Sequence, residues 1–221
     1  MAGEIARPHN GGSNEIRAPR GESLAPTSTS DGKRYIGGKT GGIDAAIFDA
    51  QIPEKTGVTI GLSGGLFNYE TTRNEVKIEA PDETAVFNAG VEDGSLSFYI
   101  DNRALDGSKH PDIYAKGLVD ASMGYFGEQG VEITAFNADW KQPGDEDRRH
   151  NWEQYTAYLD AVTARQGDLT DQDREDAARS TWSYSAIAQP YGFTSIDSLE
   201  EVEEFPGYKD IHVTFVKPSE E

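Results

Sequence analysis

The sequence contains no cysteine among its 221 residues. This absence excludes a disulfide framework, a thiol nucleophile and a zinc site built on cysteine. A chain of this length is still long enough to bury a core without such links, as one substantial domain or two small ones. The fold must therefore depend on side-chain packing.

Long apolar runs are absent as well. The longest ones, such as residues 45–48 (AAIF), fall far short of the roughly 18 residues that a membrane-spanning helix needs. The first residues, MAGEIARPHNGGSNEIR, carry charges and a proline but lack the apolar segment of a secretory signal peptide. We therefore expect a soluble chain that does not enter a membrane, and that stays in the cytoplasm or leaves by a route independent of a signal peptide.

Basic side chains are scarce, with 20 Lys and Arg against 39 Asp and Glu and a formal net charge of −19. Residues 1–33 contain four of each sign, so the excess of acid lies in the remainder of the chain. A negative surface repels phosphate backbones, which disfavours nucleic acid as a partner. Three explanations of the acidity stay open: the general acidity of proteins from high-salt or high-GC organisms, a face that mimics nucleic acid, and a face that pairs with a basic protein partner.

The composition divides the chain into three parts. Residues 1–32 are rich in Gly, Ser, Thr, Pro and Asn and have almost no periodic apolar content, which predicts a disordered tail. Residues 33–93 combine short apolar runs with Gly-rich turns, which predicts a β-rich segment. Residues 94–221 alternate strand and helix patterns, which predicts an α+β domain, either separate from residues 33–93 or forming one globule with them.

The pattern in this last part predicts a definite order of elements. A strand over 95–101 precedes a helix after Pro111, a strand that ends at Trp140, and a helix with Trp152, Tyr155, Leu159 and Val162 on its buried face. A third helix, about 171–188, begins with a capping box formed by Thr170 and Asp173. Two closing segments follow, and the last is a strand that is either central or well covered. We therefore predict an α+β fold, in which a β-rich N-terminal portion precedes a β-α-β-α-α-β-β unit that shares a mixed sheet.

Details of these elements give sharper expectations. The first helix should bury one face, and the last strand should bury alternate residues; the residues concerned are Tyr114, Leu118, Ala121 and Tyr125 for the helix, and Ile211, Val213 and Phe215 for the strand. The apolar pattern of the strand before Trp140 changes parity between Ala135 and Phe136, which indicates either a bulge or burial on both faces.

Known chemical motifs are incomplete. A Gly-Lys-Thr at 38–40 lacks the glycine that a phosphate-binding loop needs five residues earlier, where Lys33 stands. The four histidines lie far apart and give no metal-binding or triad spacing. Asp145, Glu146, Asp147 and His150 are either a solvated loop or oxygen ligands for a divalent cation, and we favour the loop. We expect no metal site and no cofactor.

Aromatic and polar side chains concentrate after residue 130. Large aromatics usually belong to the core, with their polar atoms paired at its rim. The alternative is a cleft that holds a small ligand. The candidate residues for this cleft are Trp140, Asn151, Trp152, Thr181 and Tyr184.

Several of these positions also carry a family resemblance. Trp140, Asn151, Tyr155, Thr181-Trp182-Ser183 and Tyr191-Gly192-Phe193 make residues 94–217 resemble a C-terminal module of bacterial polymorphic toxins. Those proteins deliver variable C-terminal toxin modules into competitors. The resemblance implies a role in conflict between bacteria and brings no particular reaction with it.

Two hypotheses of function follow. The first is a toxin-like or effector-like domain with a small-molecule substrate rather than a nucleic acid. The second is a non-catalytic acidic binding protein or immunity protein that neutralises a basic partner, with opposite charge increasing the association rate. A cleft lined by the five candidate residues would favour the first hypothesis, and a flat acidic face would favour the second.

Overall fold

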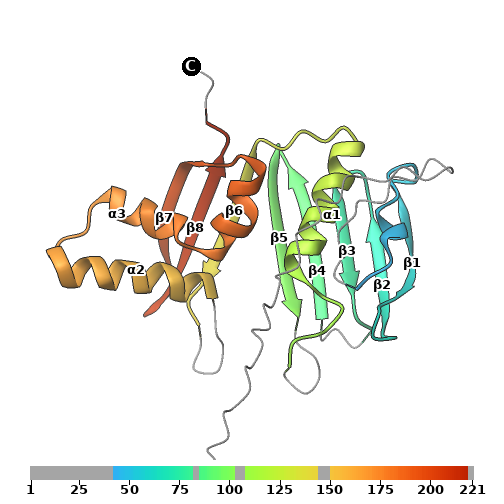
Figure 1. The fold of residues 1–221 in the computed structure, drawn as a ribbon, viewed down its shortest axis with the longest axis horizontal. Coiled ribbons are helices and arrows are strands. Elements are labelled where there is room, and N and C mark those ends of the chain that lie inside the picture. Colours follow the sequence, from blue (N-terminus) through green and yellow to red (C-terminus); the bar gives the residue numbers. More distant parts are fainter. Residues whose placement is uncertain (1–41, 82–84, 103–107, 144–149, 219–221) are drawn as a thin grey trace, which may run out of the picture. The chain divides into compact units, whose positions relative to one another are not determined.

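The computed structural model describes residues 42–81, 85–102, 108–143 and 150–218. Within these ranges the chain forms an α+β fold around one mixed sheet of eight strands. Strands come first along the chain, and helices then alternate with strands (Figure 1). The predicted fold class is therefore confirmed, including the β-α-β-α-α-β-β order of the second part.

The first five strands form an antiparallel meander after a short 3₁₀ helix. The helix covers Ala45–Phe48, and the strands are β1 (Lys55–Ile60), β2 (Leu66–Thr71), β3 (Glu75–Glu79), β4 (Ala85–Glu92) and β5 (Ser95–Asn102). β4 and β5 pair over all eight residues of each strand. The sheet is thus continuous across residues 93 and 94.

The later elements extend this sheet and place helices against it. They are α1 (Ala115–Glu128), β6 (Ala135–Lys141), α2 (His150–Gln166), α3 (Asp171–Arg179), a π-helix (Ser183–Ala188), a 3₁₀ turn (Gln189–Tyr191), β7 (Ser195–Phe205) and β8 (Tyr208–Val216). The order of strands in the sheet is β1-β2-β3-β4-β5-β6-β8-β7. β8 is therefore a central strand, which is one of the two predicted placements.

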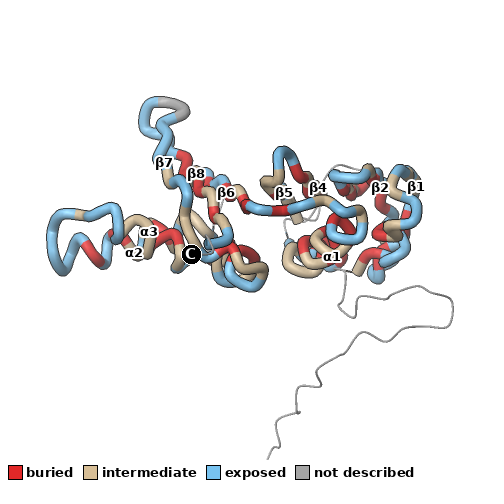
Figure 2. Tube along the Cα trace, turned by 90° about the horizontal axis from the view of Figure 1, so that it is seen from above, coloured by how far each residue is buried: buried red, intermediate tan, exposed pale blue. Residues whose placement is uncertain are grey.

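One face of the sheet carries most of the core. Buried residues alternate with more exposed ones along β3, β4 and most of β8, as the period of two in a strand requires. Figure 2 shows buried residues in the strands and in the helices. On β3 and β4 the inward residues include Val76, Ile78 and Phe87, each with 0% of its surface exposed. Leu118 and Tyr125 of α1 belong to the same apolar cluster.

Tyr114 departs from the prediction. Leu118, Ala121 and Tyr125 are buried as expected, but 59% of Tyr114 is exposed. The helix begins only at Ala115, and Tyr114 is its N-cap residue with extended backbone angles. A residue outside the helical turn does not share the helix's buried face.

The third helix is shorter than predicted. α3 ends at Arg179, and the chain continues as a π-helix from Ser183 rather than as one α-helix to residue 188. The hydroxyl groups of Ser180 and Thr181 each donate to a backbone oxygen, those of Ala177 and Ala178, at 2.7 Å. Such bonds compete with the regular helical pattern and explain the break.

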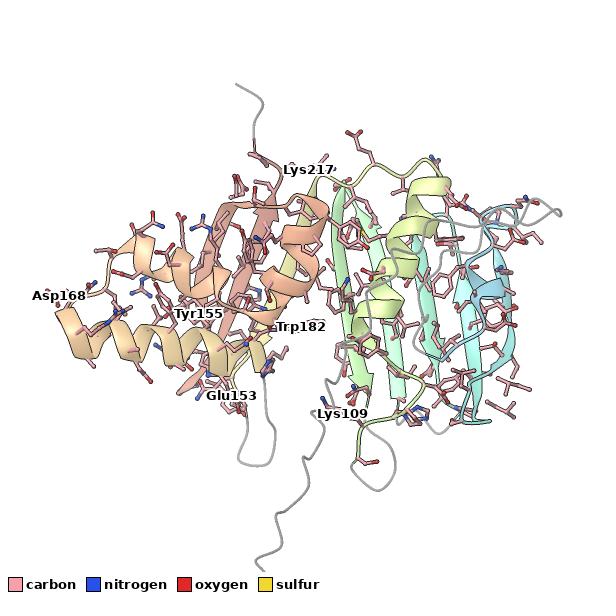
Figure 3. The ribbon with its side chains drawn as sticks, in the orientation of Figure 1. Lys109, Glu153, Tyr155, Asp168, Trp182 and Lys217 are labelled. Carbon is pink, nitrogen blue, oxygen red and sulfur yellow. The ribbon has the colours of Figure 1, made fainter. Side chains whose placement is uncertain are left out.

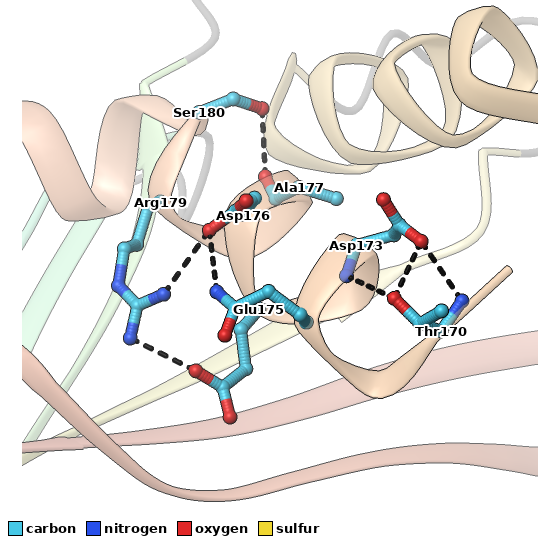
Figure 4. A network of polar contacts seen from close by, with 8 residues as sticks. Thr170, Asp173, Glu175, Asp176, Ala177, Arg179 and Ser180 are labelled. Carbon is cyan, nitrogen blue, oxygen red and sulfur yellow. Dashed lines mark hydrogen bonds and ion pairs between the residues drawn. The ribbon is translucent and has the colours of Figure 1, made fainter. Parts of the chain in front are cut away.

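The start of α3 matches its prediction in detail (Figure 4). The Thr170 hydroxyl accepts from the backbone N–H of Asp173 at 3.2 Å, and the Asp173 carboxylate accepts from the backbone N–H of Thr170 at 2.9 Å. This reciprocal pair satisfies two helix-terminal donors. The Thr170 hydroxyl also donates to the Asp173 carboxylate at 2.5 Å. This bond and the one from the Thr170 backbone N–H hold the pKa of Asp173 below its usual value.

The change of parity in β6 is explained by its first residues. β6 pairs with β8 in an unbroken register, so the structure has no bulge there. Ala135 and Phe136 are both buried, which is the two-sided burial that the pattern allowed. From Phe136 onward, Ala138 and Trp140 continue one buried face.

A buried carboxylate joins the β1–β2 turn to the segment before α1. Asp112 is 1% exposed and accepts hydrogen bonds from the backbone N–H and the hydroxyl of Ser63. A Cβ atom added at Gly61 would lie only 2.9 Å from the Asp112 Cβ. Glycine is therefore required where this turn passes the carboxylate.

Candidate functional site

The candidate site is an opening between β5 and β6. These two strands run parallel and pair at only two positions, Ser95 with Ala135 and Leu96 with Phe136. Beyond them lies a hollow of about 890 Å³. It is lined by β5, β6, the first turn of α2 and the start of the π-helix, together with residues of β3 and β4. We call it the β5–β6 opening.

The opening follows the edges of the two strands. Residues 97–100 of β5 and residues 138–141 of β6 all line it. Successive side chains of a strand point to opposite faces of the sheet. A hollow that four consecutive residues of each strand reach therefore lies along the strand edges, and not above one face only.

All three tryptophans of the chain line this opening, namely Trp140, Trp152 and Trp182. Trp140 is 4% exposed, and its ring lies 5.8 Å from that of Tyr155. Trp152 and Trp182 are half-buried; Figure 3 labels Trp182 and Tyr155. β6, α2 and the start of the π-helix thus contribute an aromatic wall.

Phenylalanines continue this wall on the strands. Phe98 of β5 and Phe136 of β6 both line the opening, and their rings stack at a centroid distance of 5.8 Å. Phe136 also stacks on Phe215 of β8 at 6.1 Å. The wall is therefore anchored in the core of the second part of the sheet.

Two side chains of α2 fix the start of the π-helix. Asn151 Oδ1 accepts a hydrogen bond from the backbone N–H of Ser183 at 2.9 Å, and Gln154 Oε1 accepts one from the backbone N–H of Trp182 at 2.7 Å. Residues three apart on a helix share a face, which lets both amides reach the same turn. These bonds hold Trp182 beside the opening.

The five residues predicted to form a cleft separate into two groups. Trp140, Asn151 and Trp152 line the opening. Thr181 is fully buried, and its hydroxyl bonds to the backbone at Ala178 and Tyr184. Tyr184 is half-buried, and its ring packs 5.5 Å from that of Phe215. Thr181 and Tyr184 therefore belong to the packing behind the site.

Charged residues on the opening are mostly acidic. Glu75, Glu92 and Asp139 line it, against Lys141 and His150 of the basic types. Asp139 Oδ1 lies 2.6 Å from Nδ1 of His212. Glu75 and Glu92 are exposed. The rim of the opening therefore attracts positive charge.

One buried polar group at the opening has no partner. The Nε1 atom of Trp140 makes no hydrogen bond within the described residues, although it is buried. An unmet buried donor costs about 1–3 kcal/mol. Nε1 itself has almost no accessible surface, so this cost belongs to the packing of the aromatic wall.

Tyr155 supports the wall from behind. Its hydroxyl donates to Glu201 Oε1 at 3.1 Å, and Arg174 Nη1 lies 2.6 Å from the same oxygen. Burial, with the neighbouring Glu201 carboxylate, raises the pKa of Tyr155 to about 12. Tyr155 is therefore a neutral donor near pH 7, and its contacts join α2, α3 and β7.

A second, smaller hollow of about 270 Å³ lies on β1, β2 and β3. Its charged lining includes Lys77 and Glu79, which already form an ion pair at 3.0 Å. Among the described residues, Tyr69 is the only aromatic one that lines it. The β5–β6 opening is the better candidate because it is larger and brings many aromatic groups together.

The described residues contain no group of three or more His, Asp or Glu side chains placed to hold a metal ion. Asp145, Glu146 and Asp147 lie outside the described residues, whereas His150 is exposed at the first position of α2.

None of the described helices has the length and apolar content that are needed to cross a bilayer.

Comparisons with models of protein families, with curated proteins and with solved structures found no match for this chain. The geometry of the β5–β6 opening is therefore the support for treating it as a functional site.

The β5 residues Phe98 and Ile100 were absent from the predicted cleft. Their alternation indicates a strand with one buried face, but nothing in it indicates that the neighbouring strand diverges.

Proposed function

We propose that this chain is a binding protein and that its β5–β6 opening holds the partner. The observation that carries the proposal is that Trp140, Trp152 and Trp182, all of the chain's tryptophans, lie on one opening. Large aromatic side chains at a recessed surface dominate the energy of recognition. A hollow of about 890 Å³ also has the size of a ligand site.

The polar lining favours recognition over catalysis. Asn151 Oδ1 is occupied by the backbone N–H of Ser183, and Asp139 is occupied by His212. A general acid or base needs to be within hydrogen-bond reach of the reacting group. Aromatic surface, strand edges and the carboxylates of the rim are left to contact a partner.

The proposed partner is a basic protein. The chain's net charge is −19, and three carboxylates stand on the rim against one lysine. Complementary charge speeds encounter and selects the partner. This proposal takes up the second of the two hypotheses, an acidic binding or immunity protein, in the setting of conflict between bacteria.

The experiment is a selection of ligands followed by matched variants. Seven-residue peptides displayed on phage are selected on the full chain, and the enriched peptides are synthesised and titrated. We expect peptides that combine Lys or Arg with apolar residues. Their affinity should fall at least about tenfold in Trp152→Ala, since loss of a hot-spot aromatic costs about 2 kcal/mol or more.

The control is Tyr114→Ala, which removes an exposed aromatic side chain that does not line the opening. Its affinity for the same peptides should equal that of the parent. Peptides that bind Trp152→Ala as tightly as the parent would place recognition elsewhere and reject the proposal.

A toxin-like or effector-like domain with a small-molecule substrate is the second candidate. It is favoured by the concave form of the site and by the three predicted cleft residues on it, Trp140, Asn151 and Trp152. Tightly controlled expression of the full chain in bacterial cells separates the two candidates. Growth arrest that Trp152→Ala abolishes and Tyr114→Ala keeps would favour the toxin, and unaffected growth would favour the binding protein.

A further inference from the structure

We infer, on the basis of the proposed binding function, that the partner enters the β5–β6 opening as an extended polypeptide segment and adds a strand between β5 and β6. The occupant is a peptide segment with alternating apolar and basic residues. The inference concerns both the backbone of the site and the side chains on each side of the sheet.

The backbone supplies two facing strand edges. β4 pairs with one edge of β5 along its whole length, and β8 does the same for β6. On their other edges, the described residues pair only at Ser95–Ala135 and Leu96–Phe136. Residues 97–100 and 137–141 thus keep an edge without a strand partner in the described part of the chain.

Such edges are templates for another strand. The N–H and C=O groups of a strand point alternately to its two sides, so part of these groups face the opening. A planar small molecule covers the aromatic wall but cannot pair with two rows of backbone groups. An extended peptide pairs with both rows through its own backbone N–H and C=O groups.

The two sides of the opening differ in chemistry. Phe98 and Phe136 belong to the side of the sheet that packs against the core. Asp139 lies on the opposite side, since it alternates with the buried residues of β6, and the exposed Glu75 and Glu92 also line the opening. An inserted strand sends alternate side chains to these two sides. Apolar residues at every second position, with Lys or Arg between them, fit both.

The length of the unpaired edge and the net charge of the chain further restrict which segment can bind in the opening. The unpaired stretch of β5 has four residues, from Ser97 to Ile100, because the backbone N–H of His110 donates to the Asn102 oxygen. Four extended residues span about 13 Å. A second copy of this chain is disfavoured as the occupant, since each copy carries a net charge of −19.

The test uses the full chain and synthetic seven-residue peptides. The first peptide alternates Lys with Val and Phe. The second has the same composition with its Lys residues grouped at one end. The third is the first peptide with N-methyl groups on two central amides, which removes backbone donors without removing a side chain. The fluorescence of the three tryptophans reports binding in each case.

We expect the alternating peptide to bind, with the grouped and N-methylated peptides at least about tenfold weaker. Trp152→Ala should also weaken binding of the alternating peptide by about tenfold or more, and Tyr114→Ala should not change it. In amide hydrogen exchange followed by NMR, the alternating peptide should protect amides within 97–100 and 137–141 that exchange rapidly in the free chain.

The outcomes separate this inference from the proposed function. If the N-methylated peptide binds as well as the alternating one, or the edge amides gain no protection, strand addition is wrong. Strand addition is also wrong if the alternating peptide does not bind. Phage-selected peptides that still depend on Trp152 would then leave the binding function standing, whereas peptides indifferent to Trp152 would reject both.

Discussion

Individual side chains show how much of the candidate site is support rather than contact surface. Thr181 and Asn151 were both predicted to line a cleft, because they are polar residues among aromatic ones. Thr181 bonds to the backbone on either side of the break after α3. Asn151 lines the opening and also holds the backbone of Ser183. A polar residue beside tryptophans can therefore serve the geometry of a site without meeting its ligand.

Thr181→Val tests this structural role. Valine has nearly the same shape but neither donates to the Ala178 oxygen nor accepts from the Tyr184 N–H. Because Thr181 is fully buried, the free energy of unfolding should fall by about 1–3 kcal/mol. Urea unfolding measures the change. Thr163→Val, on the exposed side of α2, should stay within about 0.5 kcal/mol of the parent, and an equal result for the two variants would reject the role.

Gly61→Ala tests the contact with the buried Asp112 carboxylate. The added Cβ atom would lie 2.9 Å from Asp112 Cβ, so either the turn or the carboxylate must move, at a cost of about 1–3 kcal/mol.

The control is Gly127 near the end of α1, where no heavy atom outside the helix's own backbone lies within 4 Å of an added Cβ. Gly127→Ala should therefore raise stability by up to about 0.5–1 kcal/mol. Chemical denaturation measures the free energy of unfolding of both variants. A change of the same sign in the two variants would contradict this account.

Strands and helices divide into those that local patterns determine and those that depend on distant partners. The capping box of Thr170 and Asp173, the buried face of α1 and the alternation in β8 were predictable because each arises within one segment. Tyr114 was misplaced because helix boundaries are less sharply encoded than helix faces. The break after Arg179 was missed because hydroxyl groups that bond to nearby carbonyls do not change the apolar periodicity.

The candidate site was only partly predictable for the same reason. Trp140, Asn151 and Trp152 line one opening, and the sequence could group them because they are close in sequence or in adjacent elements. Phe98 and Ile100 were missed because the opening depends on how β5 and β6 pair. That pairing is parallel and joins residues about forty positions apart, and no local pattern reports where it stops.

Tyr155, which joins α2 to β7, predicts how the free energy of unfolding changes in alkaline solution. The pKa of Tyr155 is raised to about 12 in the folded chain and is about 10 when unfolded. Below about pH 10 both forms are protonated, and the stabilising contribution is complete. As the pH rises from 10 to 12 the unfolded form ionises first, so this contribution is lost.

Tyr155→Phe removes this ionisation. The variant should lose less of its free energy of unfolding than the parent does between about pH 9 and pH 12. Unfolding in denaturant at a series of pH values gives both curves. Tyr191→Phe should act in the same direction, because burial and the hydrogen bond to Asp120 raise the pKa of Tyr191. Parallel curves for Tyr155→Phe and the parent would contradict the assignment.

The described chain as a whole is one sheet with an incomplete join. Five antiparallel strands meet three others through two residue pairs only, and the tryptophans gather where the pairing stops. If β5 and β6 paired along their whole length, there would be no opening beside the three tryptophans. The incomplete join therefore connects the topology of the fold with its proposed binding function.

Amide hydrogen exchange of the free, full-length chain tests this join most directly. If β5 and β6 are open beyond Leu96 and Phe136, amides of residues 97–100 and 137–141 that face the opening should exchange at least about tenfold faster than amides of the same strands bonded to β4 or β8. Uniform protection along both strands, as in a closed sheet, would contradict the opening and the function built on it.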